Sequence, residues 1–487
     1  MADAKRDLTA SDARNAEVRP SEAPAPSDSM HEKRYSLVTA LCMIIGICIG
    51  SGIYFKADNV LVATGGSVPL GVAMFCIASV VIVFGGLALS VYAARSEAAG
   101  GLLSYADECL PTWLARAFSW NFAILYLPVI SAVLCWVVGV YLCMVFGIGG
   151  LFGEVGPFGA SDAFAAQVLA GLVFFLLCVA WNVLTPKLSG YFQNATTFIK
   201  MLPLVAVGLA GLAYGATGQA GAGAAGAAGG VAAGGVGGLA WLAAAAPIAF
   251  SFDGWSMSTG IAPELRDSRR NLPRALVVAP FVVLALYLAY FVGLSTVLGP
   301  VTVMEAGDAS LGMFFSSLLG PDAATLPNVI ALVSVMGSAN GVVLSMMRMP
   351  YALAQRGDFP FASRVAQVSE RVGFPVWSAV AGAVMTLAWS VVHAAATVGG
   401  LIPNGDISEV SVAFNMVLLC ALFVRVPSLR REVGVGAFRG VVAPALATAG
   451  SLFVGFSALT SPGRWEFVMV YVVLLGVLFV WRGRASH

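Results

Sequence analysis

Two stretches of this sequence place glycine and polar residues in the middle of apolar runs that are long enough to be membrane helices. The first, IIGICIGSGIYF, brings Gly50, Ser51 and Gly52 together, and the second, PIAFSFDGWSMSTG, is interrupted by Asp253 and Gly254. Glycine destabilises a helix interior by about 1 kcal/mol relative to alanine. Open backbone at membrane depth is tolerated only where protein buries it or where it lines a watery cavity. The two breaks therefore predict backbone groups that face a ligand.

The polar groups of the two breaks suit a ligand that carries one acidic and one basic group. A half-helix that starts after Gly52 presents free N–H groups and the positive end of its dipole, which suit a carboxylate. A half-helix that ends near Phe250 and Ser251 presents free carbonyls, which suit an ammonium group, and Cys48 offers another carbonyl. An α-amino acid would satisfy both sets. The alternative is a pair of glycine notches for close helix packing, and two notches five spans apart argue against it.

The composition is that of a membrane protein. Of the 487 residues, 59% are hydrophobic and 10% are charged, whereas soluble domains carry about 25% charged residues. We predict an all-α membrane protein with twelve transmembrane helices, since a run of roughly 20 apolar residues can cross a bilayer. The predicted spans are 36–62, 69–94, 113–146, 164–184, 190–214, 239–266, 275–298, 326–355, 376–398, 409–427, 440–460 and 465–482.

Basic residues predict the orientation of these spans. Loops after odd-numbered spans carry only Lys56 and Arg464, against thirteen basic residues in loops after even-numbered spans. Those thirteen are Arg95, Lys187, Arg266, Arg269, Arg270, Arg274, Arg356, Arg364, Arg371, Arg425, Arg430, Arg431 and Arg439. The asymmetry predicts a multi-pass protein of the cell membrane with both termini in the cytoplasm.

The positions of the breaks and the composition divide the chain. Breaks in the first and sixth spans are the pattern of an inverted repeat. We expect a disordered cytoplasmic tail over 1–33, a first repeat of five helices over 34–214 and a flexible external Gly/Ala linker over 215–238. A second repeat of five helices follows over 239–427, and two further helices and a short cytoplasmic tail occupy 428–487.

Several classes of function lack support in the sequence. The only histidines are His31, His393 and His487, and the eight cysteines are scattered without zinc spacing, so neither a metal site nor a cofactor is expected. No glycine-rich phosphate loop is present, which argues against ATP-driven work, and the net charge of +1 suggests no nucleic-acid partner. An enzyme is not expected, because Lys200 and Asp253, in different spans, are too sparse for a catalytic cluster.

Four polar residues inside the predicted spans are candidates for function. Lys200 is a candidate by default, because placing a lysine inside the membrane costs free energy. The alternative is a side chain that snorkels to the cytoplasmic face. Asp253 could cap the broken helix by accepting from backbone N–H groups. Asn340 and Asn415 could face a cavity or form helix–helix hydrogen bonds.

Four motifs resemble the amino acid–polyamine–organocation superfamily of transporters, and within it the bacterial relatives of the L-amino acid transporters. IGSGIYF is similar to that family's first-helix signature. FSFDGWSMSTGIAPELRDSRRNLPRAL, residues 250–276, is similar to its sixth helix and the following loop. GSANGVVLSMMRMPYALAQRGDFP, residues 337–360, resembles its eighth helix, and AFNM, 413–416, is a weaker match to its tenth.

The resemblance implies a fold and a set of site residues. The fold is the LeuT-type five-plus-five inverted repeat, with broken helices 1 and 6 and two extra helices. The implied carboxylate site is formed by backbone N–H groups at Gly50, Ser51, Gly52 and Ile53. The implied amino-group site is formed by the carbonyls of Cys48, Phe250, Ser251 and Asp253. Phe250 and Trp255 are the implied gate.

The resemblance also bears on charged residues and on a partner. A lysine at the position of Lys200 resembles a fixed replacement for a sodium ion, bridging the first and eighth helices. Arg348 matches a family arginine with a structural role, and Glu264 is expected in a cytoplasmic gate or a salt bridge. Animal members join an accessory glycoprotein through a cysteine in the loop after the third span. The corresponding loop, 147–163, has no cysteine, so no disulfide-linked subunit is expected.

These observations lead to one expected function and several alternatives. We expect sodium-independent transport of neutral L-amino acids, with exchange favoured. The alternative is a proton-coupled carrier of amino acids or amines that uses Lys200 or Asp253. A nutrient sensor without flux would have the same sequence features.

Overall fold

The computed structural model is helical throughout the part of the chain that it describes, apart from isolated bridges between Tyr35 and Leu265 and between Ser369 and Phe374. The described residues are 33, 35–50, 52–55, 57–98, 100–148, 162–217, 248, 251–401, 407–460 and 465–483. Most of the predicted tail, most of the predicted linker, most of the loop after the third span, Ser51, Lys56, Phe250 and Arg464 lie outside them.

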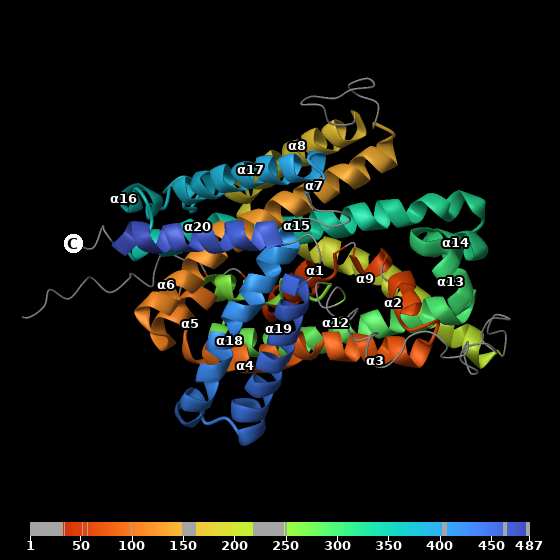
Figure 1. Cartoon of the computed structure of the whole chain (residues 1–487), viewed down its shortest axis with the longest axis horizontal. Coiled ribbons are helices and arrows are strands. Elements are labelled where there is room, and N and C mark those ends of the chain that lie inside the picture. The colour runs from red at the N-terminus through yellow and green to blue at the C-terminus, as the bar shows by residue number, and fades with distance from the viewer. Residues whose placement is uncertain are drawn as a thin grey trace, which may run out of the picture.

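The helices α12 and α15 extend across much of the molecule, and the short helix α1 lies near its centre (Figure 1). In chain order the elements are α1 (Leu37–Cys48), η2 (Gly52–Phe55), α2 (Ala57–Ala63), α3 (Val68–Ala78), α4 (Val80–Arg95), α5 (Leu102–Cys109), α6 (Thr112–Trp120), η3 (Asn121–Tyr126), α7 (Leu127–Phe146), α8 (Asp162–Leu184), α9 (Pro186–Ala216), η6 (Trp255–Glu264), α12 (Ser268–Leu298), α13 (Pro300–Ala306), η7 (Gly307–Ala309), α14 (Ser310–Leu319), η8 (Pro321–Thr325), α15 (Leu326–Gln355), α16 (Ala362–Val365), α17 (Val376–Val398), α18 (Ser408–Val433), η9 (Phe438–Val442), α19 (Ala443–Thr460) and α20 (Trp465–Gly483).

Within the described ranges, nine helices are long and apolar enough to cross a membrane, which makes this a multi-pass membrane protein. They are Val68–Arg95, Thr112–Phe146, Ala163–Leu184, Ser189–Ala216, Ser268–Leu298, Pro321–Gln355, Val376–Val398, Ser408–Val433 and Phe438–Phe456. They coincide with the predicted spans two to five and seven to eleven. The predicted start of the seventh span at 275 and end of the tenth at 427 are wrong by several residues. Both errors have one cause, because these helices continue through the charged residues that flank the membrane.

The first predicted span is broken, as expected, but the part after the break differs from the expectation. The helix α1 begins at the cap residue Ser36 and ends at Cys48, after only 12 residues. The chain continues as the four-residue 3₁₀ turn η2 and then as α2, which has seven residues. The first described turn after the break is thus 3₁₀ rather than α-helical, and α2 follows it. Any anion bound here would meet local N–H groups at a short turn.

The second break depends on one glycine. Gly254 has a φ of 90°, in the left-handed region, directly before the tight 3₁₀ helix η6. A Cβ at this position would lie 2.3 Å from Cγ2 of Ile47 in α1. Only glycine therefore fits both the backbone conformation and the space, and the two broken segments touch at this point.

A clasp joins the beginning of the described chain to the end of η6. The N–H of Tyr35 donates to the carbonyl of Glu264 at 3.0 Å, and the N–H of Arg266 donates to the carbonyl of Tyr35 at 3.0 Å. Nε of Arg266 also donates to the carbonyl of Lys33 at 3.1 Å. We call Lys33, Tyr35, Glu264 and Arg266 the N-terminal clasp. It fixes the entry to α1 against the second broken segment.

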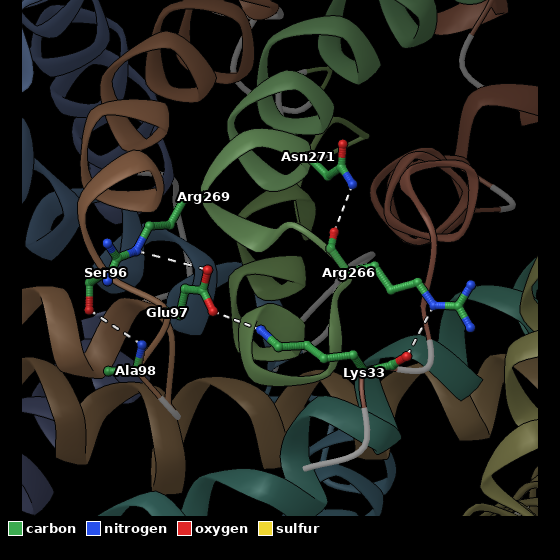
Figure 2. A network of polar contacts seen from close by, with 7 residues as sticks. All are labelled: Lys33, Ser96, Glu97, Ala98, Arg266, Arg269 and Asn271. Carbon is green, nitrogen blue, oxygen red and sulfur yellow. Dashed lines mark hydrogen bonds and ion pairs between the residues drawn. The ribbon is translucent and has the colours of Figure 1, made fainter. Parts of the chain in front are cut away.

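Glu97, in the segment after α4, adds ion pairs to the N-terminal clasp. Figure 2 shows Glu97 between two basic side chains, with Lys33 Nζ at 2.7 Å and Arg269 Nε at 3.9 Å from its carboxylate oxygens. Partial burial raises the pKa of Glu97, but Lys33 and Arg269 outweigh that effect and hold its pKa below the ordinary value. This ion pair therefore remains at neutral pH and is lost only as the pH falls into the acidic range.

Candidate functional site

The two breaks line one cavity of about 280 Å³, close to the lower end of the size range of small-molecule sites. From the first break it is lined by Cys48, Gly50, Gly52 and Ile53. From the second it is lined by Ser251, Asp253 and Gly254. The structure thus brings the described members of the two predicted backbone sets to the same space. Ser51 and Phe250, which were expected beside them, lie outside the described residues.

The N–H groups at the first break are not equivalent. The N–H of Gly50 already donates to the carbonyl of Cys48 at 2.9 Å, within a tight turn. Gly52 and Ile53 begin η2, and the first N–H groups of a helix have no partner within it. The backbone therefore leaves Gly52 and Ile53 as the better donors for a carboxylate.

Replacing Gly52 with leucine is expected to abolish substrate binding while the protein still inserts and folds. A Cβ on Gly52 would make only an ordinary 3.4 Å contact with Oγ of Ser251, so the backbone accepts a side chain. A leucine side chain would instead occupy the cavity. Scintillation proximity binding on purified protein measures the loss, and Gly52→Ala, which adds one methyl group, should lose much less. Normal affinity in Gly52→Leu would rule out this placement of the carboxylate.

The carbonyls at both breaks accept from one tyrosine that was not predicted as a site residue. The hydroxyl of Tyr287, in α12, lies 3.0 Å from the carbonyl oxygen of Cys48 and 2.8 Å from that of Ser251. Each carbonyl oxygen has two lone pairs, so each can accept from a ligand as well. Tyr287 thereby holds the two breaks at a fixed separation.

Asp253 has a partner on a third helix. Its Oδ2 accepts from the hydroxyl of Tyr126 at 2.8 Å, and Tyr126 is the last residue of η3, a π-helical turn between α6 and α7. Such turns often occur at functional sites. No side-chain cap is formed by Gly254, the residue before η6, and the capping role of Asp253 stays a prediction. The carboxylate joins the second break to the third span.

Lys200 is fully buried and its ammonium group joins α9 to α1 and α15. Nζ donates to the carbonyls of Gly46 at 2.6 Å, Ile49 at 2.8 Å and Ser334 at 2.9 Å, and lies 3.2 Å from Oγ of Ser338. A set of carbonyl and hydroxyl oxygens is the environment that a hard cation prefers. Snorkelling to a membrane surface is excluded by these contacts. The ammonium sits directly behind the first break.

Three other predicted site residues lie away from the cavity. The side chain of Asn340 accepts from Asn182 and Trp181 at 2.9 Å each, in a polar cluster between α8, α9 and α15. Asn415 is fully buried and its amide has no hydrogen-bond partner among the described residues. Trp255 packs on α4, where a Cβ on Gly85 would lie 2.8 Å from its ring. None of the three is among the residues that line the cavity.

Arg348 and Glu264 form an ion pair at 2.9 Å, with each side chain only 13% exposed. Glu264 also belongs to the N-terminal clasp through its carbonyl. This pair therefore links α15 to the end of η6, beside the entry to α1. It matches the expected salt bridge of Glu264 and the structural role of Arg348.

Comparison with known proteins identifies the family. The amino acid permease family matches residues 35–480. The chain is 27% identical over 440 residues to the serine/threonine exchanger SteT of Bacillus subtilis, which covers 89% of this chain and 92% of that protein. It is 24% identical over 475 residues to the human b(0,+)-type amino acid transporter 1, covering 94% and 89% of the two chains. It is also 24% identical over 349 residues to the human Asc-type amino acid transporter 1, covering 71% and 63%. Because the family match spans most of the sequence, the chain belongs to the amino acid permease family, which confirms the superfamily expected from its motifs.

Proposed function

We propose that this protein carries neutral L-amino acids across the cell membrane by alternating access, without sodium and by exchange. The observation that carries this proposal is the single cavity shared by the two breaks. N–H groups of Gly52 and Ile53 face a carboxylate there, and the carbonyls of Cys48 and Ser251 face an amino group. The carrier thereby binds the α-carboxylate and the α-amino group, which all α-amino acids share.

The relatives support exchange of amino acids. One is named a serine/threonine exchanger, and two others are named amino acid transporters. A neutral side chain is proposed because backbone groups at the breaks bind both charges of the zwitterion, and Asp253 already accepts from Tyr126.

Sodium independence is proposed from Lys200. Its ammonium fills an oxygen-lined position between α1 and α15, so that a fixed positive charge replaces a bound ion. For the topology we propose twelve spans in a LeuT-type five-plus-five repeat with the predicted boundaries. Both termini then lie in the cytoplasm, and the N-terminal clasp closes the cytoplasmic side.

A proton-coupled carrier of amino acids or amines is the second candidate. It is favoured by two carboxylates, Asp253 and Glu409, that line the cavity. An amine substrate would pair with one of them and would need no carboxylate site at Gly52.

Purified protein in liposomes is expected to take up labelled alanine, serine or leucine at equal rates in sodium and choline buffers. Unlabelled substrate inside the liposomes should accelerate uptake if the protein exchanges. Sodium-stimulated uptake would refute the role of Lys200, and stimulation by an inward proton gradient would favour the second candidate. Transport of putrescine without any amino acid would overturn the proposed substrate class, and binding without uptake would indicate a sensor.

A further inference from the structure

The cavity has a second wall that the two breaks do not supply. Four residues of α7 line it, namely Ile130, Val133, Leu134 and Val137. Their spacing of three, four and seven residues places them on one face of the helix. This wall is entirely aliphatic, and it suits the methylene groups of a side chain.

One charged residue stands beside this aliphatic wall. Glu409, in the first turn of α18, lines the cavity with its neighbours Ser408 and Val412. Its Oε2 atom is shielded from solvent. An ionised carboxylate is an acceptor with about four lone-pair sites, so it can receive a donor from a ligand in addition to contacts within the protein. Nothing in the sequence distinguishes Glu409, because an acid in the first turn of a helix is common for its favourable interaction with the helix dipole.

We propose that Glu409 sets the side-chain specificity of the cavity, which prefers amino acids whose side chain ends in a hydrogen-bond donor over aliphatic ones of the same size. This inference rests on the proposed function, in which the breaks hold the α-amino and α-carboxyl groups. The side chain then meets the rest of the lining, where the α7 wall packs against its stem and Glu409 accepts from its hydroxyl or amide group. Binding pockets are commonly built in this way, with apolar walls and a few polar groups that fix orientation.

Matched substrate pairs test this role directly. Serine is compared with 2-aminobutyrate and threonine with valine, each as a competitor of labelled alanine in liposomes. The donor of each pair should compete about tenfold better or more in the wild-type protein, since hydrogen bonds to charged groups are among the stronger ones. Because each ratio compares two ligands on the same protein sample, differences in folding or yield between variants cancel.

Glu409→Leu should bring both ratios close to one. Glu409→Gln keeps an acceptor oxygen without the charge, so both ratios should fall by a smaller factor. It also provides a readout if the leucine variant does not fold. Glu305→Gln, on α13 and outside the cavity lining, is the matched control and should leave every ratio unchanged.

The inference is overturned if the wild-type ratios are near one, or if both Glu409 variants keep the wild-type ratios. It is also overturned if Asp253→Asn, and neither Glu409 variant, removes the preference. A wild-type protein that binds no amino acid at all would contradict the proposed function itself. Alanine binding with ratios near one would contradict only the role of Glu409.

Discussion

Replacing Lys200 with methionine is expected to abolish uptake and to lower the thermal stability of the protein. The ammonium donates to three buried carbonyls, those of Gly46, Ile49 and Ser334. Leaving a buried polar group without its partner costs about 1–3 kcal/mol, so the loss of this charge should slow transport by roughly 100-fold or more. Uptake should fall more than substrate affinity, because Lys200 stabilises one arrangement of α1 against α15 and does not line the cavity.

Tyr54→Phe is the matched control for the lysine variant. The hydroxyl of Tyr54 donates to the backbone carbonyl of Lys200 at 2.6 Å and does not touch the ammonium. Its loss should therefore have a much smaller effect on uptake. Equal uptake by wild type and Lys200→Met in liposomes, at equal protein density, would show that the buried charge has no part in the transport cycle.

Replacing Tyr287 with phenylalanine is expected to weaken substrate binding by about tenfold or more. The variant keeps the ring but removes the hydroxyl that bridges the carbonyls of Cys48 and Ser251. The two breaks then lose their common donor, and the amino-group site loses its fixed geometry. A loss of about 1.4 kcal/mol corresponds to tenfold in affinity, which lies within the range for one buried hydrogen bond.

Tyr290→Phe provides the comparison, because Tyr290 lies one helical turn further along α12 and donates to the carbonyl of Tyr54 at 2.9 Å. That contact does not involve the cavity lining. Binding to both variants can be followed by isothermal titration in detergent. Unchanged or tighter binding to Tyr287→Phe would mean that the hydroxyl competes with the ligand for the carbonyls.

Much of the fold was predictable because bilayer thickness fixes the length of the helices. The nine long helices follow from apolar runs alone, and their ends are misjudged only where a helix such as α12 continues past the membrane through charged residues. Gly254 was predictable as a break because a left-handed backbone at this point requires glycine. The 3₁₀ turn at Gly52–Phe55 was not predictable, since a run of apolar residues after a glycine does not distinguish a 3₁₀ turn from an α-helix.

The side chains that complete the site were harder to predict than the breaks. Tyr287 and Tyr126 look like ordinary residues of apolar helices, and their partners lie 239, 36 and 127 residues away in sequence. Lys200 was identified because a charge in the membrane always needs an explanation. A single asparagine in an apolar span is compatible with a cavity residue and with a helix–helix contact. The hydrogen bonds of Asn340 to α8 are visible only in the structure.

The contact between Ile47 and Gly254 determines how closely α1 can pack against its neighbours. Ile47 also lies against Gly341 of α15, where a Cβ would come within 2.7 Å of its side chain. The side chain of Ile47 thus packs between two glycines, Gly254 after the second break and Gly341 in α15. Within α15 a glycine destabilises the helix by about 1 kcal/mol relative to alanine, so Gly341 is kept at a cost to α15 because a Cβ there would overlap Ile47. The methyl group that usually stiffens a helix would here separate α1 from the two segments that hold it, so alanine at either glycine is expected to loosen the centre of the molecule.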